Sequence, residues 1–208
     1  ITVSGKQTHG SRPWGGVDPI VTAAQIIMGV QTIASRQVDV TKAPSVVSFG
    51  QINGGVRNNI IPDTVELVGT IRNFDMDIRA DIHKRLKHTA ETIAEAAGAT
   101  ADVVVDLGYP VTVNDPALTT QMLPTVQRVV GADKVIETPV VTGAEDVSFF
   151  ALEVPGLFLY LGGAPADVDP ATAPSNHSPL FYVDESTLKP GVNVLTHLVT
   201  DYMAQAAK

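Results

Sequence analysis

The 208-residue sequence contains no cysteine and is short of basic residues, with 14 Lys and Arg against 22 Asp and Glu. The absence of cysteine excludes disulfides, thiolate zinc clusters and a cysteine nucleophile, so any metal must be held by His, Asp or Glu. The net charge of −8 argues against nucleic acid as a partner, because phosphate binding requires clustered Lys and Arg. No apolar run approaches the roughly 20 residues that span a bilayer, so we expect no membrane segment.

The charge distribution and the apolar content indicate an ordered chain of two parts. Hydrophobic residues make up 44% of the sequence, which argues against disorder. Residues 1–105 carry 10 basic and 10 acidic side chains, whereas residues 106–208 carry 4 and 12, and we therefore predict a domain in each range. The chain opens on an alternating, strand-like pattern, Ile1–Ser4, without an initiator Met, so we expect it to begin inside a larger protein. We take that protein to be cytoplasmic.

Strand and helix patterns alternate in the first region. Asp18 followed by Pro19 is a favourable helix start, and Gly98 closes the second helix. The predicted elements are strands at 1–6, 46–52, 64–72 and 101–107 and helices at 19–36 and 77–97. The resulting order, β-α-β-β-α-β, is typical of a ferredoxin-like α+β domain.

The second region contains fewer recognisable elements. The pattern predicts helices near 116–130 and 185–207, a short helix from Glu145, and strands near Val140 and at 157–161. These strands are too few for a sheet of their own, so we expect the region to complete a sheet with chain that is absent here. The loop at 162–176 carries three prolines, and a loop of this length is usually functional or poorly ordered.

Three polar positions in the first region could carry chemistry. His9, on the loop between the first strand and the first helix, could donate to a developing oxyanion or bind a metal, although a loop histidine is more often solvated. Asn59 lies in the turn at 54–62, where backbone and amide donors converge, and an ordinary β-turn is an equal alternative. Arg72, at the end of a predicted strand, could bind a carboxylate or form a surface ion pair.

The second region adds two further candidates. Gly143 stands just before Glu145 and Asp146, at a predicted helix start where capping alone would explain the acids. His177, at the end of the proline-containing loop, is a fair metal ligand. The remaining candidates are assigned structural roles, with Asp184 and Glu185 as helix caps and His83, His88 and His197 as structural or solvated side chains. Because zinc needs three or four protein ligands and the sequence has no HExxH motif, spacing alone defines no metal site.

Four stretches taken together resemble one enzyme family. They are THGSRPWGGVDPI, GGVRNNIIPDTVELVGTIRNF, TGAEDVSFFALEVPGLFLYLGG and NHSPLFYVDE. In this order and spacing they resemble the aminoacylase- and carboxypeptidase-like di-metal peptidases, and especially the hippurate hydrolases and auxin-conjugate amidohydrolases. The resemblance covers nearly the whole chain. It implies that residues 1–105 are a lid that forms a homodimer contact and that residues 106–208 are the C-terminal part of an α/β catalytic domain.

The resemblance also implies a reaction and residue roles. The family hydrolyses N-acyl amino acids or peptides with two divalent metal ions, such as zinc, manganese or cobalt, which activate a water. By this resemblance His9 polarises the scissile carbonyl, and Asn59 holds the substrate carboxylate or oxyanion. Arg72 and Gly143 are grouped with Asn59 as substrate-binding residues, and His177 matches a metal ligand.

The family's other metal ligands and its general base lie in an N-terminal half that this sequence lacks. We therefore expect the chain alone to be inactive and to expose an apolar surface where that half would pack. An alternative from a different class is a non-catalytic dimerisation or binding module that retains the lid fold. Within the enzyme class, a diaminopimelate deacylase or a true carboxypeptidase is a further alternative.

Overall fold

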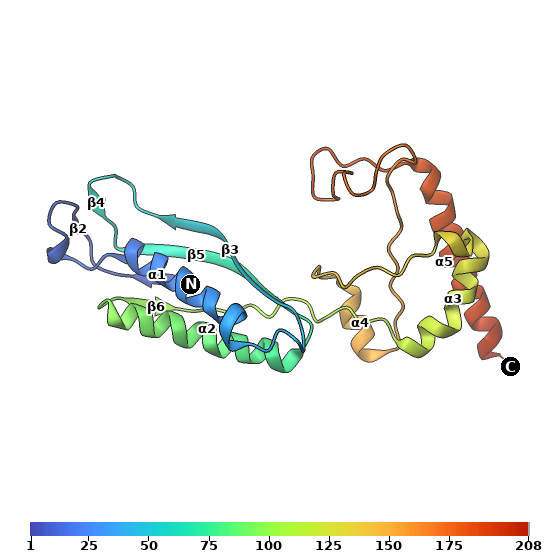
Figure 1. The fold of residues 1–208 in the computed structure, drawn as a ribbon, viewed down its shortest axis with the longest axis horizontal. Coiled ribbons are helices and arrows are strands. Elements are labelled where there is room, and N and C mark those ends of the chain that lie inside the picture. Colours follow the sequence, from blue (N-terminus) through green and yellow to red (C-terminus); the bar gives the residue numbers. More distant parts are fainter. Residues whose placement is uncertain (208) are drawn as a thin grey trace. The chain divides into compact units, whose positions relative to one another are not determined.

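The computed structural model describes residues 1–207, which form two compact units (Figure 1). The first unit runs from Ile1 to Gly108, and the second begins at Tyr109. The boundary predicted from the sequence falls after Val105. None of the helices in the described residues combines the length and the apolar character needed to cross a bilayer.

A four-stranded antiparallel sheet forms one layer of the first unit. Its strands, in spatial order, are β3 (Ser45–Gly54), β5 (Thr64–Asn73), β1 (Thr2–Ser4) and β6 (Thr100–Asp102). Helix α1 (Pro19–Thr32) follows β1, and helix α2 (Met76–Ala96) follows β5. This is the β-α-β-β-α-β order of a ferredoxin-like domain, so the predicted fold of the first region is confirmed.

The observed elements differ from the predicted ones at a few points. Strand β6 has only three residues because its neighbour β1 has three, and a ladder cannot extend beyond its partner. Helix α1 passes into a π-helical turn at Ile33–Gln37. Two short strands that the sequence analysis missed, β2 (Thr8–His9) and β4 (Ile60–Ile61), form a separate two-stranded ladder.

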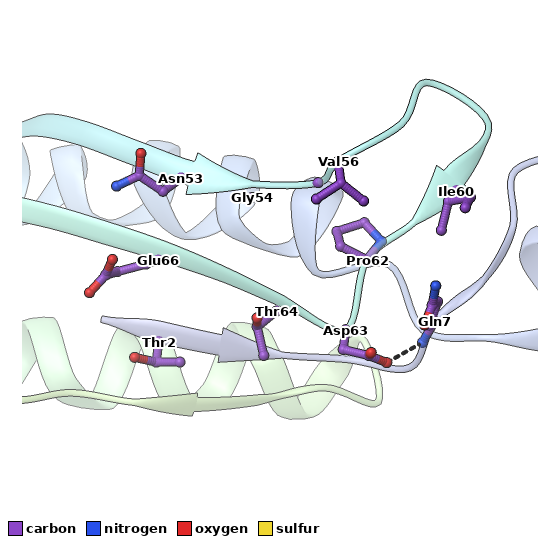
Figure 2. A pocket seen from close by; sticks show the side chains of 11 residues that line it. Thr2, Gln7, Asn53, Gly54, Val56, Ile60, Pro62, Asp63, Thr64 and Glu66 are labelled. Atoms are coloured by element: carbon purple, nitrogen blue, oxygen red, sulfur yellow. Dashed lines mark hydrogen bonds between the residues drawn. The ribbon is translucent and has the colours of Figure 1, made fainter.

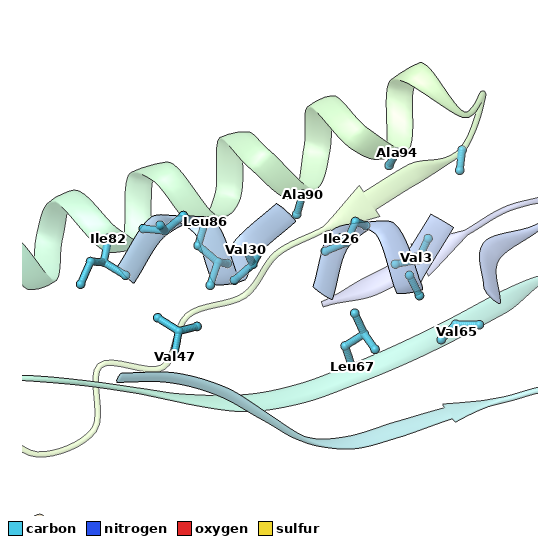
Figure 3. Packing of buried hydrophobic residues seen from close by; sticks show 13 residues of the cluster. Val3, Ile26, Val30, Val47, Val65, Leu67, Ile82, Leu86, Ala90 and Ala94 are labelled. Carbon is cyan, nitrogen blue, oxygen red and sulfur yellow. The ribbon is translucent and has the colours of Figure 1, made fainter. Parts of the chain in front are cut away.

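The core of the first unit lies between the sheet and the two helices, as Figure 3 shows. On β5, Val65 and Leu67 are each 1% exposed, whereas Thr64 and Glu66 lie on the opposite, solvent-facing side of the strand. This alternation with period two is what one buried face requires. The helices contribute Ile26, Val30, Ile82 and Leu86 to the same cluster.

Both helices of the first unit begin at an aspartate cap. The side chain of Asp18 accepts the backbone N–H groups of Ile20 and Val21 at 2.8 and 3.2 Å, and Asp75 caps α2 in the same way. Such caps satisfy helix donors that have no partner within the helix. The Asp18 cap fixes the start of α1 and therefore the end of the loop that carries His9.

Helices dominate the described part of the second unit. They are α3 (Pro116–Val130), α4 (Val147–Glu153) and α5 (Leu188–Ala206), with short 3₁₀ turns at Ala132–Lys134 and Glu185–Thr187. Polar contacts centred on Asp201 join α5 to α3, because its carboxylate accepts from the Thr125 hydroxyl at 2.7 Å and from Arg128 at 2.6 Å. The three helices that the sequence predicts for this region, near 116–130, from Glu145 and near 185–207, are all present.

The strands predicted near Val140 and at 157–161 are wrong for this chain, since the described residues of the second unit contain no strand. A strand is held by hydrogen bonds to a neighbouring strand, and this unit offers none over residues 109–207. The segment at 156–158 instead hydrogen-bonds to Asn114 and Asp115, immediately before α3.

Few apolar side chains of the second unit are buried. Those below one-tenth exposure in the described residues are Met122, Val126 and Val194. By contrast, α5 presents an exposed apolar row at helical spacing, formed by Leu188, Val192, Leu195, Val199 and Tyr202. This row is the kind of exposed apolar surface that the sequence analysis expects in the second region.

Candidate functional site

The loop that carries His9 is closed at its base. The backbone groups of Lys6 and Val17 exchange hydrogen bonds of 2.9 and 3.0 Å. Gly16 makes this approach possible, because a Cβ atom there would lie 2.3 Å from the carbonyl oxygen of Lys6. The sequence between these residues therefore forms a defined loop rather than a free connection.

The β2–β4 ladder brings His9 to Asn59. His9 pairs with Ile60 in this antiparallel ladder, and the Gly10 N–H donates to the carbonyl oxygen of Asn59 at 2.8 Å. His9 and Asn59 are both exposed. Two candidates separated by 50 positions in the sequence thus lie close together, His9 in β2 and Asn59 in the turn immediately before β4. The ladder was not predictable from the sequence because strands of two residues have no detectable periodicity.

The His9 ring is held by its own loop. Its Nδ1 atom lies 3.1 Å from the Ser11 backbone nitrogen, which donates to it, and 2.7 Å from the Ser11 hydroxyl. The turn is closed by the Arg12 N–H, which donates to the His9 carbonyl at 2.8 Å. The imidazole is therefore oriented by hydrogen bonds even though it is exposed.

An open recess of about 690 Å³ lies next to this ladder, on the solvent-facing side of the sheet (Figure 2). Its walls are partly apolar, with Val56, Ile60 and Pro62, and partly polar, with Asp63 and Glu66. Figure 2 also shows the Asp63 carboxylate accepting the Gln7 N–H, at 2.9 Å. This bond continues the contact between the β2 and β4 segments towards the main sheet.

Arg72 lies at the other end of β5 from this ladder. It pairs with Val46 at the start of β3, whereas Thr64 stands at the end of β5 nearest to β4. At about 3.3 Å per residue, Thr64 and Arg72 are separated by about 26 Å along the strand. The structure therefore brings His9 and Asn59 together and leaves Arg72 apart from both within one chain.

The candidates of the second unit lie on its surface. Gly143 is exposed in the segment that precedes α4. Neither nearby acid caps this helix with its side chain, contrary to the prediction, because Asp146 at the cap position already has helical backbone angles. The Glu145 carbonyl instead accepts from the Ser148 hydroxyl at 2.6 Å.

Asp184 is a cap as predicted, but of the 3₁₀ turn that precedes α5, whereas Glu185 lies within that turn and is not its cap. The Ser186 N–H donates to the Asp184 carboxylate at 2.9 Å at the start of the 3₁₀ turn that leads into α5. This backbone hydrogen bond, with a further one from the Ser186 side chain, holds the pKa of Asp184 below its ordinary value. The carboxylate is thus used in local structure.

The described residues do not form a metal site. His177 is exposed on its loop, and over residues 1–207 no group of three or more His, Asp or Glu side chains converges. Because a metal ion needs several protein ligands, His177 could supply one of a set whose other members lie outside these residues. The arrangement around His9, by contrast, offers hydrogen-bond donors without a metal.

Comparison with known proteins gives a family match within the first unit and relatives for nearly the whole chain. Residues 1–98 match the family described as the peptidase dimerisation domain. The chain is 36% identical to thermostable carboxypeptidase 2 of Saccharolobus solfataricus, over 92% of this chain and 47% of the relative. It is 33% identical to N-acetyl-L-cysteine deacetylase of Bacillus subtilis, over 90% of this chain and 43% of the relative. The chain thus spans about half the length of the curated relatives it matches.

Solved structures show the same fold. A crystal structure from methicillin-resistant Staphylococcus aureus, named as an aminohydrolase, superposes with a TM-score of 0.78 at 28% identity and covers 97% of this chain and 51% of its own. A Bacillus subtilis protein described as a dinuclear metal-binding peptidase from the M20 family gives a TM-score of 0.62 at 24% identity, over 95% of this chain and 48% of its own. At that identity the likeness concerns the fold alone.

The ferredoxin-like first unit is therefore a peptidase dimerisation domain. Over nearly its whole length the chain is similar to carboxypeptidases and N-acyl amino acid deacetylases, as the two curated relatives show.

Proposed function

We propose that this chain is part of a metal-dependent amidohydrolase that cleaves the amide bond of N-acyl amino acids or small peptides. The chain would supply the lid, the dimer contact and one metal ligand. A further segment, equivalent to the other half of the relatives, would supply the rest of the catalytic domain. The observation that carries the proposal is the β2–β4 ladder, which holds His9 beside Asn59. The curated relatives are named as a carboxypeptidase and an N-acetyl-L-cysteine deacetylase, and these names support amide hydrolysis as the proposed reaction.

His9 and Asn59 would act as hydrogen-bond donors. An imidazole N–H and a carboxamide N–H can each stabilise the oxygen that gains negative charge when an amide carbonyl is attacked. Such donors are most effective where water is excluded, and both residues are exposed in this chain. The proposal therefore requires that another part of the enzyme, or a second copy, covers them during the reaction.

Arg72 and Gly143 are retained as proposed substrate-binding residues. An N-acyl amino acid is much shorter than the distance of about 26 Å between Thr64 and Arg72 along β5. Arg72 and His9 of one chain would therefore serve different substrate molecules. In a dimer, each of these side chains can belong to a different active site.

We assign His177 as one ligand of the metal centre. The two divalent ions, zinc, manganese or cobalt, would be held mainly by residues outside this chain. The chain by itself would then have no amidase activity and would not retain a metal pair. Elemental analysis of the purified chain tests this, with fewer than one divalent ion per chain expected. Two ions per chain would contradict the proposed division of ligands.

We propose that the first unit forms a homodimer through the free edge of β3. This strand is ten residues long, and among the described strands only β5 pairs with it. The Gln31 side chain donates to the Val47 carbonyl at 3.3 Å, and the rest of this edge can accept a second strand. Ile20, which is 43% exposed and lies beside Gly55 immediately after β3, adds apolar surface.

Sedimentation velocity measures this association. Ile20→Arg should shift the chain towards monomer, because it places a charge beside the proposed contact. Ala80→Arg, on exposed α2 surface, is the matched control and should leave the dimer intact. A chain that is monomeric at every concentration would exclude the dimer.

Kinetics of the complete enzyme test the reaction. His9→Ala should lower kcat/KM for N-acyl amino acids by about 10²-fold or more, since an oxyanion donor is lost. His88→Ala removes an exposed histidine of α2 and is the matched control. An enzyme that is unaffected by His9→Ala, or inactive on all acyl amino acids with each metal, would favour the non-catalytic module instead.

A further inference from the structure

The contact between Ser11 and the His9 ring determines which ring nitrogen carries the proton. A backbone amide hydrogen has a fixed position and is always present, so the atom that it faces must offer a lone pair. The Ser11 N–H donates to Nδ1 of His9 at 3.1 Å. Nδ1 is therefore the acceptor, and a neutral imidazole holds its single proton on Nε2.

The Ser11 hydroxyl is compatible with the same state. It lies 2.7 Å from Nδ1 and can rotate, so it also donates to this nitrogen when the ring is neutral. The opposite tautomer, with the proton on Nδ1, would place the ring N–H against the fixed Ser11 N–H. Two donors would then face each other, which is unfavourable.

The backbone around this contact is braced. The Arg12 N–H donates to the His9 carbonyl at 2.8 Å, and the Thr8 hydroxyl donates to the Arg12 carbonyl at 3.0 Å. The β2–β4 ladder fixes His9 from the other side. The Ser11 N–H therefore cannot turn away from the ring without opening the turn.

We propose that Ser11 is a positioning residue that fixes the Nε2–H tautomer of His9. This makes the neutral imidazole a hydrogen-bond donor at the nitrogen remote from the loop. The inference rests on the proposed function in one respect, which is that the substrate carbonyl is the acceptor. A neutral donor of this kind can polarise a carbonyl without carrying a full charge.

The test is nitrogen NMR of the ¹⁵N-labelled chain at a pH where the imidazole is neutral. We expect Nδ1 of His9 to have the chemical shift of an unprotonated nitrogen and to show a scalar coupling, across the hydrogen bond, to the Ser11 amide nitrogen. His88, which is exposed on α2, is the internal control and should show no such coupling. A protonated Nδ1, or no coupling at His9, would overturn the proposal.

Two variants distinguish the role of the Ser11 hydroxyl from that of the Ser11 backbone N–H. Ser11→Ala retains the backbone N–H and should keep both the coupling and the tautomer. Ser11→Pro removes the N–H and should abolish the coupling. In the complete enzyme Ser11→Pro should lower kcat by about tenfold to hundredfold with little change in KM, because the donor is misplaced. A Ser11→Pro enzyme with unchanged kcat would contradict the positioning role.

The outcomes distinguish this inference from the proposed function. If the coupling is present and His9→Ala has no effect on activity, the tautomer is fixed but the proposed reaction is wrong. If His9→Ala abolishes activity and the coupling is absent, the reaction stands and the role of Ser11 fails.

Discussion

The side-chain amide of Asn114 satisfies both backbone groups of Phe158. Its Oδ1 accepts the Phe158 N–H at 2.7 Å, and its Nδ2 donates to the Phe158 carbonyl at 2.9 Å. A primary amide has the same donor and acceptor as a peptide group, so Asn114 occupies the place of a neighbouring strand. A single side chain thus holds a segment whose sequence pattern predicts a strand.

Asn114→Ala should release this segment. The partly buried backbone groups of Phe158 would lose their partner, and we expect the second unit to lose about 1–3 kcal/mol of stability. Hydrogen exchange at the Phe158 amide measures the effect and should accelerate. Asn176→Ala, at an exposed loop position, is the control and should leave this amide protected. Equal exchange rates in both variants would show that Asn114 does not hold the segment.

Gly69→Ala should destabilise the first unit. A Cβ atom at this position would lie 2.3 Å from the Ser48 carbonyl oxygen of the neighbouring strand, so the β3–β5 ladder would have to open. Overpacking of this kind costs about 1–3 kcal/mol. Gly50→Ala, on the facing strand, is the matched control because its Cβ would meet no atom within 4 Å. Urea unfolding should give a lower midpoint for Gly69→Ala alone.

Asp201 should titrate at unusually low pH. The Thr125 hydroxyl, and then Arg128, hold the pKa of this carboxyl below its ordinary value. A lowered pKa in the folded state means that the Asp201 contribution to stability is present above the unfolded pKa of about 3.9 and is lost as the pH falls through the lower folded value. A carbon-detected NMR titration measures the pKa of the Asp201 carboxyl. Thr125→Val should raise the pKa, and an unchanged titration would refute the assignment.

His83 should resist protonation. Partial burial in α2, together with the nearby charge of Arg79, lowers the pKa of its imidazole. Because the unfolded chain then binds the proton more readily, the stability of the first unit should fall as the pH drops below about 6.5. Thermal unfolding at pH 7.5 and 5.5 measures the difference, which His83→Gln should reduce. An NMR titration of His83 above pH 6.5 would contradict the prediction.

The fold of the first unit is predictable because its elements are long and periodic. The apolar positions of α2 and the alternation of β5 both follow from one buried face. The boundary at Asp18 was also predicted from capping chemistry, whereas the Asp75 cap was missed and the second helix was placed from residue 77. The strands expected in the second unit were not predictable in this way, since a strand depends on a partner elsewhere in space.

The candidate site was only partly predictable for the same reason. Motif resemblance selected His9 and Asn59, but their proximity depends on a ladder of two residues per strand. The distance of Arg72 from that ladder follows from the register of β3 against β5, which periodicity does not determine. The contact of Ser11 with His9 is a local turn geometry that leaves no signature in the sequence.

The shortness of the β2–β4 ladder makes the site thermodynamically separate from the domain that carries it. A pair of two-residue strands is marginally stable, so it can open while the main sheet and its core remain folded. The amides of Gly10 and Ile60 should consequently exchange by local fluctuation, and those of Val65 and Leu67 by global unfolding. The order of the histidine loop can therefore change without altering the stability of the dimerisation domain.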